Sequence, residues 1–323
     1  MLRSLYSGVS GMRSFQTKMD VISNNIANVN TTGFKSGRVR FQDMLSQNIA
    51  NAQSPTASGL GGINGQQIGL GVKVGSIDTI MTGGALQPTY RDLDFAIEEG
   101  GFFIVSSDAG ATTLYTRDGA FYTDHKGNLV NSGGLRVLGY VPDGEIDPES
   151  RTYADLSEVD EDNPGVSLPE EDEDNLRALT IPPYLADDGS VTEKGDGDDD
   201  TVFELQEYTV DGTGKVIGVY SNGTESKTFL LGQIGMVKFQ NPEGLSKAGG
   251  NNYKATENSG VPEAGVAGGK GYGYIRQGFL EMSNVDLANE FTEMIVTSRA
   301  YQANSRSITT SDEMLQELIN LKR

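Results

Sequence analysis

The longest uninterrupted helical signal lies at the end of the chain. Residues 283–323 contain no Gly and no Pro, so nothing in them stops a helix once it has begun. Ser283 and Asp286 form a capping-box start, and Lys322 and Arg323 lie where a helix dipole favours positive charge. Polar residues interrupt the apolar stripe, so we expect its partner surface to be wetter than a globular core. The stripe consists of Leu287, Phe291, Met294, Ile295, Tyr301, Ile308, Leu315 and Ile319.

A matching stripe lies at the start of the chain, where apolar residues and one Gly recur at alternating intervals of four and three. This heptad pattern predicts a helix that pairs with the C-terminal one as a coiled coil. The alternative is an ordinary bundle within a globular domain, but the sequence between the two stripes has no third amphipathic helix of similar length. We expect the assembly interface to combine the C-terminal stripe with Leu5, Met12, Phe15, Met19, Ile22, Asn25, Ile26 and Val29.

Both terminal segments resemble a known family. Residues 7–34, SGVSGMRSFQTKMDVISNNIANVNTTGF, are similar to the N-terminal motif of the bacterial flagellar axial proteins, the rod and hook family. The segment from Ser283, SNVDLANEFTEMIVTSRAYQANSRSITTSDEMLQELINLKR, resembles the matching C-terminal motif. The resemblance implies that the terminal helices form the inner wall of a helical tube of stacked subunits.

Within the family, the sequence favours a hook subunit. NSRSITTSD (residues 304–312), the ending LINLKR and GGINGQQIGLGV (residues 61–72) resemble hook sequences. The expected function is a structural subunit of the flagellar hook, a flexible tube that joins rod to filament and transmits torque. The alternative within the family is the distal rod protein. The alternative from another class is an acidic extracellular coiled-coil adhesin or calcium-binding surface protein, which would not polymerise into tubes.

The resemblance also implies partners and a location. The partners are further copies of the chain, the rod and hook-filament junction proteins, the hook cap and the flagellar type III export apparatus. The location is the extracellular hook and basal body of the flagellum. The N-terminus lacks the continuous apolar region of a secretory signal, which agrees with export by that apparatus.

The middle of the chain predicts a β-rich domain nested between the helices. Residues 75–141 and 202–278 have short strand-like runs separated by turn dipeptides such as Asp118-Gly119, Asp211-Gly212 and Asn222-Gly223. We therefore expect a multi-domain α+β protein with an inner coiled-coil domain (1–33 and 283–323), a linker (34–74) and a mostly-β outer domain. Inside the linker, Phe41 and Leu45 resemble a short export signal of rod and hook subunits, although two apolar residues at i and i+4 more often mark one turn of a packed helix.

Nearly all of the negative charge lies in one acidic insert, residues 142–201. The whole chain has a net charge of −20, and residues 143–200 hold 21 acidic residues against Arg151, Arg177 and Lys194, a balance of −18. Six prolines and the low hydrophobicity predict a solvated excursion, except for RALTIPPYL (residues 177–185), which is expected to return as an edge strand. The charge argues against nucleic acid as a partner.

The sequence provides little for catalysis, cofactors or metals. It has no Cys, one His, no nucleophile elbow, no HExxH and no phosphate-binding loop, so we expect no enzyme activity and no cofactor. No apolar run is long enough for a membrane span, and we expect no membrane insertion. From Asp196 to Glu207 acidic residues follow the spacing of a calcium loop, but Thr201 stands where the sharp turn needs Gly, so an acidic turn is the better interpretation.

We predict that assembly depends on ionic strength and not on which cation supplies it. The acidic inserts of neighbouring subunits repel one another. Salt weakens this repulsion, because the Debye length falls from ~30 Å at 0.01 M salt to ~10 Å at 0.1 M. Turbidity in NaCl and in CaCl₂ at equal ionic strength should therefore differ only modestly. A saturable micromolar calcium requirement that Asp198→Ala removes would contradict this and favour a ligand loop.

Overall fold

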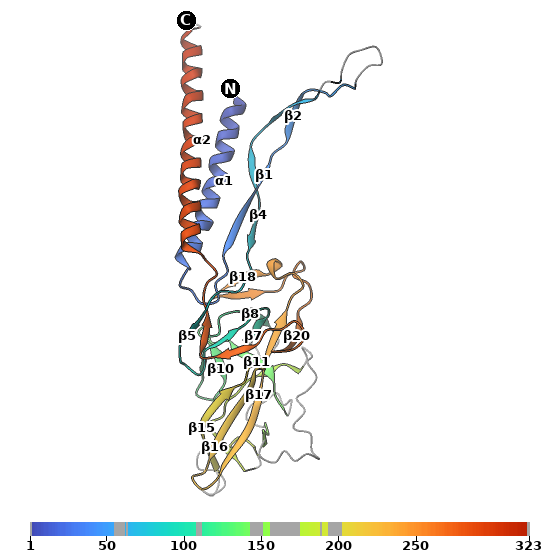
Figure 1. Cartoon of the computed structure of the whole chain (residues 1–323), viewed down its shortest axis with the longest axis vertical. Helices are drawn as coiled ribbons and strands as arrows, with labels where there is room; N and C mark the ends of the chain where they lie inside the picture. Colours follow the sequence, from blue (N-terminus) through green and yellow to red (C-terminus); the bar gives the residue numbers. More distant parts are fainter. Residues whose placement is uncertain are drawn as a thin grey trace. The chain divides into compact units, whose positions relative to one another are not determined.

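The computed structural model describes residues 2–54, 62, 64–107, 112–142, 151–155, 175–187, 189–192 and 202–321. The chain divides into two compact units, which we describe separately. Unit 1 consists of residues 1–29, 35–80 and 285–323, and unit 2 consists of residues 30–34 and 81–284. Each unit is therefore assembled from segments that are far apart in the sequence (Figure 1).

Unit 1 pairs two long helices and adds two β-hairpins. Its helices are α1 (Leu2–Ala27) and α2 (Leu287–Leu321). Its strands are β1 (Gly37–Asp43), β2 (Ser46–Ala50), β3 (Gln66–Gly69) and β4 (Val72–Thr79). β1 pairs antiparallel with β4, and β2 with β3. Figure 1 shows α1 and α2 side by side, with β1 and β4 next to them.

The start of α2 is fixed by Asp286. Its carboxylate accepts hydrogen bonds from the backbone N–H groups of Ala288 (2.9 Å) and Asn289 (3.4 Å), which is the geometry of an N-cap. The helix therefore begins at Leu287, four residues later than the sequence suggested from Ser283. α1 ends at Ala27, and the chain then turns at Gly33, whose φ of +65° is easiest for a residue without Cβ.

Strands replace the expected linker. Most of the chain between residues 37 and 79 pairs as β1–β4 and β2–β3, and it belongs to the compact unit of the helices. β4 alternates between half-buried and exposed residues, with Val72, Val74 and Ser76 on the less exposed face. This period of two is the pattern of a strand with one covered face. In the sequence, the apolar residues of this region are scattered among Gly, Gln and Asn, so the alternation typical of a strand was not recognised.

Unit 2 contains one large antiparallel sheet and two small ones. The path through the large sheet is β14-β15-β16-β17-β11-β7-β8-β19-β18, and β6 pairs β21 and β5 pairs β22 separately. The strands are β5 (Leu86–Pro88), β6 (Phe95–Ile97), β7 (Phe102–Ser106), β8 (Thr113–Thr116), β9 (Phe121–Thr123), β10 (Leu129–Asn131), β11 (Arg136–Tyr140), β12 (Ala154–Asp155), β13 (Arg177–Ala178), β14 (Tyr184–Ala186), β15 (Val202–Val210), β16 (Lys215–Ser221), β17 (Ser226–Lys238), β18 (Ser246–Gly249), β19 (Asn252–Lys254), β20 (Glu263–Val266), β21 (Ile275–Gln277) and β22 (Phe279–Glu281).

The long strand β17 holds the sheet together. It pairs with β16 and β12 in its first half and with β11, β7 and β20 in its second half. Its register against β16 shifts between Val216 and Ile217, and a bulge of this kind bends a strand and increases its twist. Gly232 lies at the bulge with φ +154°, and a Cβ there would lie 2.9 Å from the carbonyl oxygen of Tyr140. β17 can therefore pair with two different sets of strands along its length.

The acidic insert is not a solvated excursion throughout. Arg151 and Tyr153 are buried, and β12 pairs with β17. The return segment expected from residues 177–185 forms β13, which pairs with β11, and β14, which pairs with β15. Arg151 donates to the carbonyl oxygen of Ala178 at 2.6 Å, so the described parts of the insert bind one another. Residues 143–150, 156–174 and 193–201 lie outside the described residues.

We predict that Phe121→Ala lowers the free energy of unfolding of unit 2 by about 3–5 kcal/mol, the usual cost of emptying an aromatic core position. Phe121 is 0% exposed and packs edge-on against Phe103, with ring centroids 5.3 Å apart. Tyr122, the next residue of β9, is 46% exposed, so Tyr122→Ala is a matched control with a small effect. Denaturant unfolding followed by circular dichroism measures both, and equal losses would contradict the burial argument.

Candidate assembly interface

The two helices of unit 1 run antiparallel. Ser4 lies opposite Ser311 with 3.4 Å between the hydroxyl oxygens, Lys18 forms an ion pair with Glu293, and the Asn25 amide donates to Glu290 at 3.2 Å. Residues later in α1 thus contact residues earlier in α2. These contacts join the first and last helices of the chain.

Small residues bring the helices close together. A Cβ added to Gly8 would lie 3.0 Å from Cγ1 of Ile308, and one added to Gly11 would lie 2.7 Å from Nδ2 of Asn304. Thr297 and Ser311 are the buried residues of α2. The seam between the helices therefore contains small and polar side chains together with Ile308.

The hairpin of β1 and β4 covers another face of α1. The Asn25 side chain is 1% exposed and bonds to Gly37 in both directions, donating to its carbonyl oxygen at 2.9 Å and accepting from its N–H at 3.0 Å. The rings of Phe15 and Phe41 meet edge to face at 5.5 Å. Burial raises the pKa of the Glu290 carboxyl, and the hydrogen bond from Asn25 lowers it, with burial the stronger influence. Asn25 thus contacts α2 and β1 from its position in α1.

The structure places the predicted interface residues in two different environments. On α1, Ile22 is buried, while Leu5, Met12, Phe15, Met19 and Ile26 are half-buried, as is Val29, which follows the end of the helix. On α2, Met294, Ile308 and Leu315 are half-buried, whereas Leu287, Phe291, Ile295, Tyr301 and Ile319 are exposed. The α2 residues that cover α1 include Thr297, Asn304 and Ser311, which the apolar pattern did not single out. A search for small residues at heptad spacing would have found them.

The two residues of the possible export signal are both accessible. Phe41 lies in β1, and its ring also lies 6.0 Å from the Lys18 ammonium. Leu45 lies between β1 and β2 and is 83% exposed. Neither residue belongs to a helical turn, so the local structure differs from the packed-helix interpretation.

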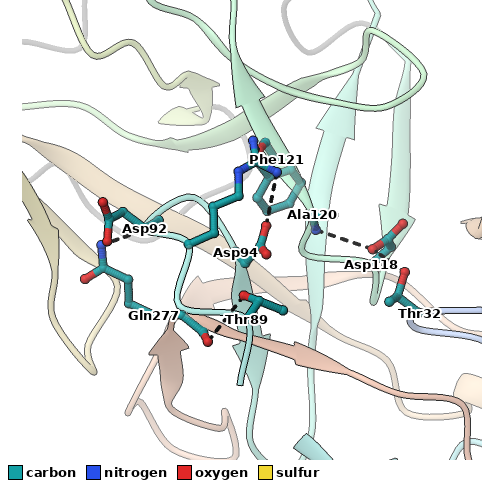
Figure 2. A network of polar contacts seen from close by, with 10 residues as sticks. Thr32, Thr89, Asp92, Asp94, Asp118, Ala120, Phe121 and Gln277 are labelled. Carbon is teal, nitrogen blue, oxygen red and sulfur yellow. Dashed lines mark hydrogen bonds and ion pairs between the residues drawn. The ribbon is translucent and has the colours of Figure 1, made fainter. Parts of the chain in front are cut away.

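Unit 2 holds its first and last segments together. The Gly33 N–H donates to the carbonyl oxygen of Glu281 at 2.8 Å, and the carboxylate of Glu281 forms a buried ion pair with Arg117 at 3.1 Å. Figure 2 shows a neighbouring polar network, in which Asp118 lies beside Ala120 and Thr32, and Gln277 reaches Asp92. The acidic residues of this network accept hydrogen bonds from backbone groups and neighbouring side chains, so their role is structural.

The described residues contain no metal-binding cluster. Within ranges 2–54, 64–107, 112–142 and 202–321 and the shorter described segments, no group of His, Asp and Glu could hold a metal ion. Asp196 to Thr201 of the suggested calcium loop lie outside this part, and Glu204 and Glu207 lie in β15. No helix of the described part is long and apolar enough to cross a membrane.

Three family models match the chain. The model described as flagella basal body rod protein matches residues 5–35, the flagellar hook protein FlgE/F/G D1 domain matches residues 96–218, and the flagellar basal body rod FlgEFG protein C-terminal model matches residues 276–321. Together they cover α1, much of unit 2 and α2.

Curated relatives include both rod and hook proteins. The chain is 44% identical to the flagellar basal-body rod protein FlgG of Bacillus subtilis over 324 residues, which covers 100% of both chains. It is 35% identical to the flagellar hook protein FlgE of Borreliella burgdorferi over 447 residues, again covering 100% of both. A hook protein FlgE of Helicobacter mustelae is 50% identical over 164 residues, which cover 51% of this chain and 36% of that protein.

We predict that Gly8→Leu loosens the helix pair, because the new side chain has no room beside Ile308. Amide hydrogen exchange of α1 and α2 should become faster, while exchange in unit 2 stays unchanged. Ala303→Leu, an exposed position of α2, adds comparable bulk without meeting α1 and is the control. Unchanged exchange in Gly8→Leu would mean that the close approach is not needed.

Proposed function

The chain belongs to the family of bacterial flagellar rod and hook proteins, and we propose that it is a rod subunit that polymerises with copies of itself into a tube. Proteins of this family are structural components of the flagellum, and the chain is not an enzyme. The finer choice between rod and hook rests on length and identity. The match to the FlgG rod protein spans 324 residues at 44% identity, whereas the match to the FlgE hook protein needs 447 positions for a chain of 323 residues and therefore contains long gaps.

The observation that supports polymerisation is the apolar surface of α2. Leu287, Phe291 and Ile295 are exposed, and so are Val296 and Ile319. Monomeric proteins rarely leave such residues in a continuous row, because each buried aliphatic or aromatic side chain contributes about 1.5–3 kcal/mol. We propose that α1 and α2 form a coiled-coil inner layer and that this apolar surface contacts neighbouring subunits.

The hook remains the second candidate. It is favoured by the 50% identity to a hook protein over 164 residues and by the hook-like segment at residues 304–312. Electron microscopy of the polymer separates the two candidates, because a straight, stiff tube fits a rod and a curved tube fits a hook. The partners we propose are adjoining rod and hook subunits and the flagellar export apparatus, with Phe41 and Leu45 as the export signal. The hook-filament junction proteins and the hook cap become partners only for a hook.

We predict that Ile295→Asp raises the protein concentration needed for polymerisation by at least ~10-fold, the equivalent of ~1.4 kcal/mol per subunit. Ile295 is 63% exposed, so the folded monomer loses little, and its thermal unfolding should change only slightly. Sedimentation of polymers across a concentration series gives the threshold.

Val261→Asp is the matched control, because Val261 is 77% exposed but lies in unit 2, away from the helices in sequence. It should polymerise as the unmodified chain does. If the Ile295→Asp variant polymerised normally, the exposed apolar surface of α2 would not be part of the subunit interface.

A further inference from the structure

A groove in unit 1 lies between α1 and the strands beside it. It encloses a volume of about 570 Å³, and its wall includes Tyr6 and Val9 from α1 and Met44 and Val72 from the strand side. We call it the α1 groove. Arg3, Arg13 and Lys73 also line it, and the lining contains no acidic residue. The described residues supply no ion-pair partner to these three cations. The groove is thus apolar with a positive rim.

The end of α2 extends beyond the start of α1. Ser311 meets Ser4 near the start of α1, so residues 312–321 continue past it for about 15 Å at 1.5 Å per residue. We call these residues the α2 overhang. Met314, Leu318 and Leu321 are exposed and share one edge of the helix, spaced by four and three residues.

The α2 overhang also has the charge that the groove lacks. Asp312, Glu313 and Glu317 are exposed, and Glu313 and Glu317 lie next to the apolar edge of Met314 and Leu318. The carboxyl end of a helix adds a partial negative charge from its unpaired carbonyl groups. Lys322 and Arg323 follow in the sequence outside the described residues. The described overhang therefore presents the negative charges of Glu313 and Glu317 beside its apolar edge, whereas Asp312 lies on the opposite side of the helix.

We propose that the α2 overhang of one subunit docks in the α1 groove of a second copy of this chain, with its apolar edge on Tyr6 and Met44 and its carboxylates beside Arg3, Arg13 and Lys73. This inference rests on the proposed self-assembly and assigns it a specific contact. The overhang cannot fill the groove of its own chain, because α2 is held antiparallel on the Gly8 and Gly11 side of α1 and continues away from Arg13.

Cysteine cross-linking tests the contact, because the chain has no Cys of its own. Tyr6→Cys and Leu318→Cys are made in separate full-length chains, mixed, polymerised and treated with a short bis-maleimide. We expect a cross-linked dimer in the mixture that neither variant yields alone. Val261→Cys, mixed with Leu318→Cys, is the control and should yield none, because Val261 is equally accessible but belongs to unit 2.

Charge reversal provides the second measurement. Arg13→Glu with Lys73→Glu in one chain, or Glu313→Lys with Glu317→Lys in one chain, should each raise the polymerisation threshold by ~10-fold or more. A chain with all four substitutions should recover much of the loss, because the opposite charges face each other again. Glu257→Lys with Glu263→Lys, two exposed positions of unit 2, changes the net charge as Glu313→Lys with Glu317→Lys does and is the control for that variant.

The results separate the docking from the proposed function. Tubes that form without the Tyr6–Leu318 cross-link, or charge reversals that act no differently from the unit 2 control, overturn the docking and leave self-assembly intact. An unmodified chain that forms no polymer at any salt concentration overturns the proposed function and the docking with it.

Discussion

The close approach of α1 and α2 is the constraint on which unit 1 depends. Gly8 and Gly11 leave no space for a Cβ beside Ile308 and Asn304, so these glycines allow the two helices to approach closely. Thr297 and Ser311 are the buried residues of α2, whereas several of its large side chains, such as Phe291 and Ile295, are exposed. The same geometry that joins the two ends of the chain therefore also makes the surface through which subunits can associate.

The sequence predicted a helix at each end of the chain, but not which face of α2 packs against α1. Apolar residues at helical spacing are expected to be buried. Phe291 and Ile295 fit this spacing whether the same chain or another chain buries them. Thr297 and Ser311 are buried because they are small, a property that hydrophobicity does not measure. The pairing of β1 with β4 was missed for a related reason, since only one face of β4 is covered, and its less exposed face includes the polar residue Ser76 as well as Val72 and Val74.

The β-rich middle was predictable in class but not in connectivity. Turn dipeptides such as Asp211-Gly212 and Asn222-Gly223 lie where β15, β16 and β17 form hairpins. The buried position of Arg151 was not predictable, because an Arg surrounded by acidic residues reads as part of a solvated segment. Its partner, the carbonyl oxygen of Ala178, lies 27 residues away and is created by the fold.

The hydrogen bond between Gly33 and Glu281 influences the order in which the chain folds. Ser4 and Ser311 are 307 residues apart, and closing so long a flexible loop costs conformational entropy that two helices with a polar seam recover poorly. If unit 2 folds first, it holds the backbone N–H of Gly33 and the carbonyl oxygen of Glu281 2.8 Å apart. The two helices then start from neighbouring points of attachment when they pair. Contacts that are remote in the sequence then form between segments that are already held close together.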